Sequence, residues 1–517
     1  MRPRIFFLSA LFCTLLCGMA TAIAAPQRLV IVVLDQMRPD YIDTYNLPHL
    51  KALRQAGMEF RNGHVGHFPS ITVVSHPTIA TGLFPRHFGW SDDILQDATG
   101  SWHEASVLSL NDYRTILARS LPRPTALRLL KNHLGGLVFS VGEKGYAAMT
   151  MGGLDADTVI TMRKIKEGPW AGWCQPEGLN VPAYIARPEG GRFYVDCRPD
   201  YGTADTLYAL DGNHYVPGDD PDHLGGDVWA TDVALTLLTR EPKWRVLLLT
   251  LGAIDKIGHI FGEMDNQKIQ RTTRHRPYQL AKVLQIADAQ VGRLIEHLKS
   301  AGLWEDTIFF LTADHGGISA AKHFYNDPPP KGRVTGVFGR FTEKDAFTPP
   351  TAAAPWLQRE TVAHAVLGTA NRIWLTDAAR GNAGTHCKNF AQMPGAIDAY
   401  VKHATPSWHY ERCTFPRRST RLPYFLDPVS LLGTVASPTA PDLVVQLAEE
   451  TGYGLPGDHG GFQEKSMRIP MLLHVAAVGA GTTECPMRLV DIMPTAMRLL
   501  GLQPPAWLDG NAACLTP

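Results

Sequence analysis

Six side chains of the kinds that bind metal ions stand in four short segments of the chain. They are three aspartates and three histidines: Asp35, Asp255, His259, Asp314, His315 and His459. Asp255 and His259 are four residues apart, so both lie on one face if their segment is helical. Singly, each acid has another explanation, such as a helix cap or a solvated loop. Together, these carboxylates and imidazoles are the ligand set of a metal centre.

Phosphoryl transfer is a chemistry that needs such a centre. Two cations about 4 Å apart can hold the attacking and leaving oxygens of an in-line displacement and neutralise charge on the transferred group. A nucleophile is then still required. The segment 68–82 supplies Thr72, close to an expected helix start where backbone N–H groups favour an anion. Without that context the segment is a Ser/Thr-rich turn.

Alternating apolar runs and helical segments predict the elements that position these residues. The runs 28–35, 244–251 and 307–312 are typical of strands buried on both faces, and 47–57, 228–238 and 279–301 have helical spacing. Three later segments continue the pattern: 442–447, 470–475 and 489–500. We therefore expect an α/β fold with a mainly parallel sheet covered by helices on both faces. The candidate residues follow these runs, and the carboxyl ends of strands are where such sheets bind ligands.

Two long segments differ from this pattern. Residues 122–221 and 327–428 are rich in proline, glycine, aromatic residues and cysteine, and they are predicted to be inserted cap segments. The rest of 25–517 is expected to form one catalytic domain.

The amino terminus has the features of a signal peptide. Arg2 and Arg4 precede the apolar run 5–19, and the small-x-small pattern of Ala22-Ile23-Ala24 predicts cleavage near Ala24. An uncleaved anchor is the alternative. No later run approaches the roughly 20 apolar residues that span a bilayer, so no membrane span is expected in the mature chain. We expect a periplasmic or secreted protein.

Six cysteines follow the predicted cleavage site. An even number in an oxidising compartment favours disulfides, and sequential pairing would join Cys174 to Cys197, Cys387 to Cys413 and Cys485 to Cys514. Free buried thiols are the alternative, and a zinc knuckle is disfavoured because no C-x-x-C spacing occurs.

The charge balance excludes a nucleic-acid-binding surface. The chain has 49 Lys and Arg residues against 49 Asp and Glu residues, with no long stretch of one sign. Binding to nucleic acid requires a concentrated positive field. The expected partner is a small molecule.

The motifs together resemble the alkaline phosphatase superfamily. In its branch of type I phosphodiesterase/nucleotide pyrophosphatases, and in the threonine-nucleophile alkaline phosphatases, five elements occur in a fixed order. They are a strand-end Asp, F-P-[ST]-x-T-x-x-x-H-x-T-x-x-T-G, D-x-x-G-H, T-A-D-H-G and a late H-G. All five are present here, between residues 35 and 460.

The resemblance implies a role for each matching position. Thr72 would be the nucleophile and would also contact a metal held by Asp35, Asp314 and His315. A second metal would be held by Asp255, His259 and His459. Two zinc ions are implied, with manganese as the alternative. His76 also matches the motif, and we interpret it as structural.

Substrate choice depends on three positions where this chain keeps or departs from the family pattern. Asp93 stands where the family has an Asn, and an acid there would repel a doubly charged phosphate. The K-x-R pair of the monoesterases reads Lys144-Gly145-Tyr146, so the lysine is kept and the arginine is replaced by a residue without charge. Weaker binding of a doubly charged phosphate favours phosphodiesters or nucleotide pyrophosphates as substrates, because their reacting phosphorus carries a single negative charge.

Other functions stay open. Lys144 keeps monoester hydrolysis possible, and phosphonate hydrolysis is a third candidate. A catalytically silent, metal-bound binding protein of the envelope is a hypothesis of a different class. A sulfatase is disfavoured because no C-x-P-x-R segment occurs, and a Rossmann oxidoreductase is excluded because no G-x-G-x-x-G follows the first expected strand.

Overall fold

The computed structural model describes most of the chain. It covers residues 26–96, 101–105, 108–121, 123–164, 170–175, 226–261, 276–319, 322–323, 353, 355–413, 424–453 and 457–515. The predicted signal peptide over 1–24 lies outside these residues. Within them, no helix is long and apolar enough to cross a membrane.

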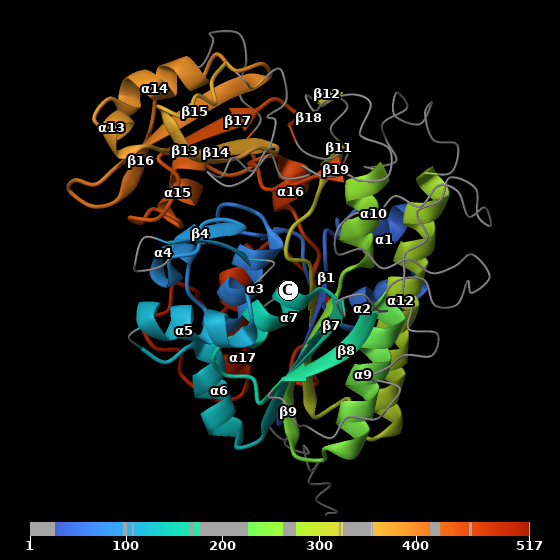
Figure 1. The fold of residues 1–517 in the computed structure, drawn as a ribbon. Coiled ribbons are helices and arrows are strands. Elements are labelled where there is room, and N and C mark those ends of the chain that lie inside the picture. The colour runs from blue at the N-terminus through green and yellow to red at the C-terminus, as the bar shows by residue number, and fades with distance from the viewer. Residues whose placement is uncertain are drawn as a thin grey trace, which may run out of the picture.

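A nine-stranded sheet forms the centre of the molecule (Figure 1), with the strand order β21-β2-β20-β10-β1-β9-β6-β7-β8. Its strands are β1 Arg28–Leu34, β2 Met58–Phe60, β6 Leu137–Gly142, β7 Thr158–Lys164, β8 Trp170–Gln175, β9 Trp244–Leu251, β10 Thr307–Thr312, β20 Met471–His474 and β21 Gly481–Thr483. The central strand β1 pairs in parallel with β10 on one side and β9 on the other. β6 continues the parallel pairing beyond β9, as expected for a mainly parallel sheet.

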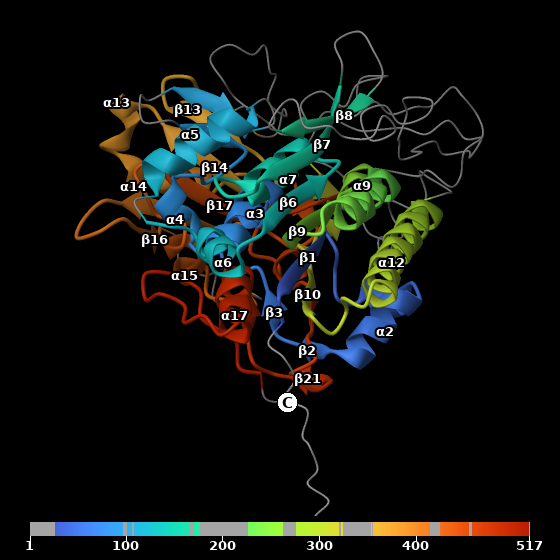
Figure 2. The same ribbon diagram turned by 90° about the horizontal axis from the view of Figure 1, so that it is seen from below.

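Helices cover both faces of this sheet, as Figure 2 shows in a view along it. One layer contains α2 Pro48–Ala56, α9 Gly226–Arg240, α10 Ala253–Phe261 and α12 Arg276–Ser300. The other layer contains α3 Thr72–Thr81, α6 Ala126–Leu134, α7 Gly145–Gly152 and α17 Ile492–Leu499. Strands without polar side chains on either face need such double cover, because each uncovered face would leave apolar area in water.

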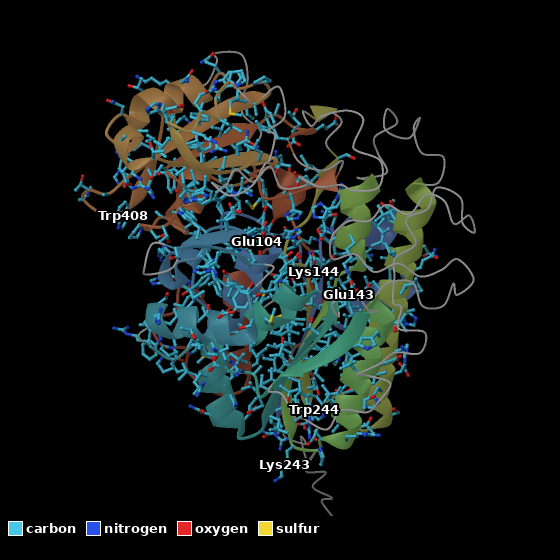
Figure 3. All side chains as sticks on the ribbon, viewed as in Figure 1. Glu104, Glu143, Lys144, Lys243, Trp244 and Trp408 are labelled. Atoms are coloured by element: carbon cyan, nitrogen blue, oxygen red, sulfur yellow. A yellow bond between two sulfur atoms is a disulfide. The ribbon has the colours of Figure 1, made fainter. Side chains whose placement is uncertain are left out.

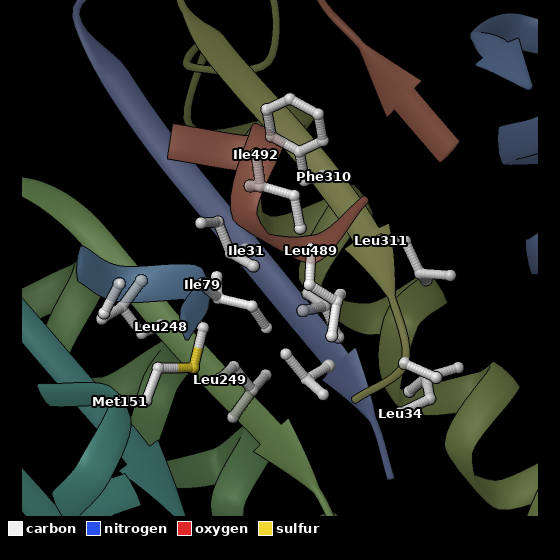
Figure 4. Packing of buried hydrophobic residues seen from close by; sticks show 14 of the residues in the cluster. Ile31, Leu34, Ile79, Met151, Leu248, Leu249, Phe310, Leu311, Leu489 and Ile492 are labelled. Atoms are coloured by element: carbon white, nitrogen blue, oxygen red, sulfur yellow. The ribbon is translucent and has the colours of Figure 1, made fainter. Parts of the chain in front are cut away.

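The core fills the space between the sheet and its helices. Residues 29–34 of β1 are all fully buried. Figure 4 shows Ile31 of β1 and Leu248 of β9 close to Ile79 of α3 and Met151 of α7. The apolar runs that predicted strands therefore form the interior of the main domain.

A second sheet forms a separate lobe, coloured orange in Figure 1. It has five antiparallel strands in the order β13-β14-β17-β15-β16 and its own apolar core. The strands are β13 Val362–Val366, β14 Ala370–Leu375, β15 Ala396–His403, β16 His409–Arg412 and β17 Leu443–Leu447, with helices α13 Asp377–Arg380 and α14 Ala383–Phe390. Trp408, at the outer edge of this lobe in Figure 3, is one of the few large exposed apolar side chains.

Short elements complete the described chain. They are α1 Tyr41–Thr44, β3 Gly63–His64, α4 Pro85–Phe88, β4 Ile94–Gln96, β5 Trp102–Glu104, α5 Leu110–Ser120, β11 Ile318–Ser319, β12 Lys322–His323, α15 Pro428–Gly433, β18 Thr451–Gly452, β19 Gly457–Asp458, α16 Glu464–Met467 and β22 Met487–Arg488.

The architecture differs from expectation in three places. The segment 122–221 is not wholly outside the sheet, because it contributes β6, β7 and β8. The run 442–447 is a strand, but β17 belongs to the lobe and not to the main sheet. The run 470–475 forms β20, which pairs antiparallel to β10. A strand signal in the sequence does not identify the sheet that the strand joins, because pairing is decided by distant residues.

Two disulfides agree with sequential pairing. Cys387 pairs with Cys413 in the lobe, and Cys485 pairs with Cys514 near the carboxyl terminus. The third expected pair, Cys174 with Cys197, lies outside the part of the chain whose side chains the structure describes.

Candidate active site

Asp35, Asp314 and His315 meet at the carboxyl ends of two neighbouring strands. Val33 of β1 is paired with Thr312 of β10, so Asp35 and Asp314, each two residues further on, leave the sheet at the same level. His315 Nε2 lies 3.4 Å from Asp35 Oδ1 and 3.4 Å from Asp314 Oδ2. One ligand atom from each residue lies within 4.8 Å of the other two. We call these three residues the strand-end group.

Asp255, His259 and His459 form a second group of the same size. Asp255 and His259 lie one turn apart on α10, which follows β9 directly, as the spacing predicted. His259 Nε2 is 3.1 Å from Asp255 Oδ1, and His459 Nε2 is 3.5 Å from the same oxygen. Their ligand atoms also lie within 4.8 Å of one another. We call these residues the helix–loop group, because His459 comes from the loop after β19.

All three imidazoles are oriented in the same way. Nδ1 of His259 bonds to the carbonyl of Gly457 at 2.8 Å, Nδ1 of His315 to that of Gly316 at 2.9 Å, and Nδ1 of His459 to that of Ser70 at 3.0 Å. A carbonyl only accepts, so Nδ1 carries the proton and Nε2 carries the lone pair. Each Nε2 therefore points into its group as a potential ligand atom, which is the arrangement typical of metal-binding histidines.

Thr72 lies beside both groups as the first residue of α3. The helix begins there because Ile71 is extended, and it ends at Gly82, whose φ of +68° is the left-handed conformation typical of a helix end. Thr72 Oγ1 is 3.3 Å from His315 Nε2 and 3.2 Å from Lys144 Nζ. Thr72 therefore presents its hydroxyl at a helix N-terminus, as the sequence predicted.

Lys144 connects the two groups electrostatically. It follows β6, lies near the centre of Figure 3, and its Nζ donates to Asp35 Oδ2 and Asp255 Oδ2, both at 2.7 Å. Burial opposes its charge, but Asp255 and Asp35 outweigh burial and raise the pKa of Lys144 well above its ordinary value. These carboxylates therefore favour the charged form of Lys144.

The titration behaviour of the strand-end group follows from burial. Desolvation, together with Asp255 and Asp314, raises the pKa of Asp35 well above its usual value. Desolvation also lowers the pKa of His315 to about 3, so its imidazole is neutral at physiological pH. A neutral imidazole is the form that binds metal ions.

The other two expected substrate residues are Tyr146, in the first turn of α7, and Asp93, directly before β4. The ring of Tyr146 is centred 5.3 Å from Lys144 Nζ and packs against the small apolar cluster of Ile71, Val73, Val74 and Ala105. Burial is the main cause that raises the pKa of the Tyr146 phenol, and Asp93 adds to it. Asp93 is therefore close enough to Tyr146 to act on it electrostatically.

Several residues around the site were not found from the sequence. Asp92 is fully buried and forms an ion pair with Arg372 of β14, and Thr369 donates a hydrogen bond to the carbonyl of His459. No sequence pattern pairs Asp92 with a residue 280 positions away. His76, which we interpreted as structural, bonds to the Thr72 carbonyl and to the Thr250 hydroxyl, both at 2.9 Å.

Comparison with known proteins identifies the family. The profile of the type I phosphodiesterase / nucleotide pyrophosphatase family matches residues 29–332, which is more than half of the chain. The chain belongs to this family. As a member it is a phosphoric ester hydrolase, and the matched range includes five of the six candidate ligands together with Thr72.

Two relatives place it within the family. Alkaline phosphatase PhoK of Sphingomonas sp is 24% identical and aligns over 95% of this chain and 92% of its own length. Bis(5'-adenosyl)-triphosphatase ENPP4 of Bos taurus is 21% identical over 58% of this chain and 49% of its own length. The first similarity includes the lobe, whereas the second covers only part of each protein.

Solved structures share the fold. The crystal structure of wild-type alkaline phosphatase PafA superposes with a TM-score of 0.64 at 15% identity and covers 95% of this chain and 98% of that chain. Murine ectonucleotide pyrophosphatase / phosphodiesterase 5 gives a TM-score of 0.54 at 15% identity, over 94% of this chain and 100% of that chain. An inactive variant of the murine protein is known in complex with AMP.

Proposed function

We propose that the protein is an exported, two-metal phosphoric ester hydrolase with Thr72 as nucleophile, acting on phosphodiesters or nucleotide pyrophosphates. The observation that carries this proposal is the meeting of two three-residue ligand groups around the Thr72 hydroxyl and the Lys144 ammonium. Export, to the periplasm or the medium, is inferred from the sequence of residues 1–24.

The donor atoms fit two divalent ions. Within the described part of the chain, Asp35 Oδ1, Asp255 Oδ1 and Asp314 Oδ2 are buried and accept no hydrogen bond. Buried carboxylate oxygens almost always have a partner, because an unpaired buried charge is costly. A bound cation would supply the missing partner of these three oxygens. Mixed imidazole and carboxylate ligands suit zinc, with manganese as the alternative.

The two ions, when bound, would supply positive charge to the phosphoryl oxygens and lower the pKa of the Thr72 hydroxyl. Thr72 Oγ1 loses its proton to solvent and attacks phosphorus, the bond from phosphorus to the leaving oxygen breaks, and that oxygen leaves with the bonding electrons and takes up a proton. Phosphorus is then bound to Thr72 and, for a diester substrate, still carries its second ester group. Attack by water on phosphorus breaks the bond to Thr72 Oγ1, which is reprotonated, and releases a phosphomonoester, or inorganic phosphate when the substrate is a monoester. Lys144 Nζ, 3.2 Å from Thr72 Oγ1, is placed to donate to a phosphoryl oxygen.

The preference for singly charged phosphorus centres rests on Asp93 and Tyr146. Tyr146 offers one neutral hydrogen-bond donor where the monoesterases resembled by this chain have an arginine. Asp93 acts electrostatically on Tyr146 and adds to the rise of its phenol pKa. A phosphomonoester dianion would meet less compensating positive charge here than in a site with that arginine, whereas a singly charged diester needs less of it.

Monoester hydrolysis is the second candidate, and Lys144 is the observation in its favour. Its ammonium lies within hydrogen-bond distance of the nucleophile. The alignment with an alkaline phosphatase over 95% of the chain also supports monoester hydrolysis.

The deciding experiment compares zinc-dependent kcat/KM on p-nitrophenyl phosphate and bis-p-nitrophenyl phosphate, with Thr72→Ala as control. A higher value on the diester supports the proposal, and a clear monoester preference favours the second candidate. Zinc binding without turnover of either ester, or of a phosphonate, would favour a silent binding protein. Equal activity of Thr72→Ala would exclude Thr72 as the nucleophile.

A further inference from the structure

The lobe reaches the helix–loop group through one turn. Thr369 lies between β13 and β14 and is fully buried. Its hydroxyl donates to the backbone carbonyl of His459 at 2.8 Å. The carbonyl of Thr369 in turn accepts from the side-chain amides of Gln446 and Gln463, each at 3.3 Å, so the turn itself is fixed.

The opposite side of the His459 segment is held by the main domain. The Ser70 carbonyl accepts from His459 Nδ1 at 3.0 Å, and the Ser70 hydroxyl accepts from the Gly460 amide at 3.2 Å. Ser70 therefore sets the direction of the imidazole, whereas Thr369 holds the backbone of the same residue from the lobe. His459 is therefore held from two sides, by Ser70 of the main domain and by Thr369 of the lobe.

The fit between lobe and segment is close enough to require glycine. A Cβ atom on Gly461 would lie 2.9 Å from Thr369 Oγ1, and one on Gly460 would lie 3.2 Å from Arg372 Nη1. Gly460 also has a φ of +98°, a conformation that other residues rarely adopt. The ion pair of Arg372 with the buried Asp92 fixes the lobe to the main domain beside this contact.

We propose that Thr369 is a positioning residue for the helix–loop group, through which the lobe sets the metal affinity of that group. This inference rests on the proposed function, because it requires that Asp255, His259 and His459 bind an ion. Removing a residue that holds a metal ligand in position by a hydrogen bond typically weakens metal binding by about 10- to 100-fold. The strand-end group has no hydrogen bond with Thr369 in the described part of the chain. It meets His459 through the stacked ring of His315, with centroids 3.6 Å apart, so its affinity is expected to change less than that of the helix–loop group.

The test uses two threonines of the lobe whose hydroxyls each donate to a backbone carbonyl, the buried Thr369 and the partly exposed Thr376. Thr369→Val removes the hydroxyl that binds His459, and Thr376→Val removes a hydroxyl that donates to the Glu360 carbonyl, also at 2.8 Å. Thr369→Ser keeps the hydroxyl and serves as the conservative variant. Zinc affinity is measured on the full mature protein by titration against a competing chelator, and bound zinc per chain is measured by elemental analysis.

We expect Thr369→Val to bind one of its two zinc ions at least tenfold more weakly, with Thr369→Ser and Thr376→Val within about threefold of the wild type. The loss of zinc affinity caused by Thr369→Val should also be seen in a protein that carries Asp314→Asn. Asp314→Asn is expected to remove the ion of the strand-end group, so only the ion of the helix–loop group is then measured. Equal zinc affinities of Thr369→Val and Thr376→Val would overturn the inference while leaving the proposed function intact. A wild-type protein that binds no zinc would overturn both.

A folding control accompanies the titration. The thermal unfolding of the zinc-free variants is compared, since a general loss of structure would weaken both ions together. If Thr369→Val does not fold, the zinc affinities of Thr369→Ala and Thr369→Ser are compared instead, because only the second variant keeps the hydroxyl. Loss of both ions to the same extent in a folded variant would count against a selective role of Thr369.

Discussion

The two ligand groups are built in different ways. The strand-end group takes its residues from positions directly after β1 and β10, which are hydrogen-bonded neighbours in the main sheet. The helix–loop group takes two residues from α10 and the third from a loop that lies between the main domain and the lobe. One group is thus fixed by a single sheet, and the other depends on the relative placement of two bodies.

This difference shows how a site can combine a rigid half with an adjustable half. Register fixes Asp35 against Asp314, because β1 and β10 pair continuously from Arg28 with Thr307 to Val33 with Thr312, and shifting one strand would break this ladder. The segment of His459 has only a short ladder, in which Asp458 pairs with Ile318 of β11, and a hydrogen bond from His259 of α10 to the Gly457 carbonyl. The position of His459 itself relies on individual hydrogen bonds with Ser70 and Thr369.

The largest expected effect comes from removing one ligand from each group. Asp314→Asn and His459→Ala should each lower kcat/KM by about a thousandfold, roughly 4 kcal/mol, because each removes one cation from the reacting phosphoryl group. Elemental analysis should find one zinc ion in each single variant and none in the double variant. Two tightly bound ions in His459→Ala would show that the helix–loop group does not bind metal as proposed.

The next effect concerns the attachment of the lobe. Arg372→Met leaves the fully buried Asp92 without its ion-pair partner and should cost about 3 kcal/mol of unfolding free energy, measured by denaturant titration. Adding Asp92→Asn to this variant should recover much of that loss, because the unpaired charge is removed. A single variant as stable as the wild type would mean that the lobe is held by other contacts.

A smaller effect is expected at the substrate side of Lys144. Tyr146→Arg should raise the ratio of monoester to diester kcat/KM by about tenfold, since a guanidinium beside Lys144 can bind two oxygens of a dianion. Tyr146→Phe removes the hydroxyl without adding charge and should change this ratio by less than about threefold. If Tyr146→Arg leaves the ratio of monoester to diester kcat/KM unchanged, Tyr146 does not determine the choice of substrate.

The smallest effect is a pH dependence of stability in the segment that precedes Ser70. Burial lowers the pKa of His67 to about 3, below the ordinary value near 6.5 of the unfolded chain. The unfolded state therefore binds more protons below pH 6.5, and the contribution of His67 is present above that pH and is lost as pH falls towards 3. Between pH 6.5 and 5.5 this loss is about 1 kcal/mol.

Urea unfolding in the presence of a chelator measures this effect without a contribution from metal release. His67→Gln keeps a neutral hydrogen-bonding side chain and should lose about 1 kcal/mol less than the wild type over the same pH interval. An equal loss in both proteins would assign the pH dependence to other groups.

The sequence predicted the strand-end half of the site well, for a physical reason. Buried parallel strands leave a clear apolar run, and the first polar residue after such a run must lie at the edge of the sheet. Asp35 and Asp314 satisfy this condition, His315 directly follows Asp314, and the structure brings the three together. The i, i+4 spacing of Asp255 and His259 was equally informative, because α10 forms where it was expected.

The lobe and its contacts could not be predicted in the same way. Thr369 and Arg372 carry no local signal, because their partners are determined by how one body docks on another. The strand β6 was also missed, since its run of six residues follows Gly135 and Gly136 inside a segment rich in proline and glycine. Its importance lies in Lys144, which it delivers to the centre of the site.

The order of strands in the lobe has a consequence for engineering the protein. The central strand β17 comes from residues 443–447, beyond the end of the expected insertion at 428, and it lies between β14 and β15. Deleting 327–428 would therefore leave β17 in place with both of its edges unpaired, and such an exposed apolar strand is a template for aggregation. The lobe cannot be removed by deleting the expected insertion alone. Any shortened version of the enzyme that keeps the lobe must retain the chain through Leu447.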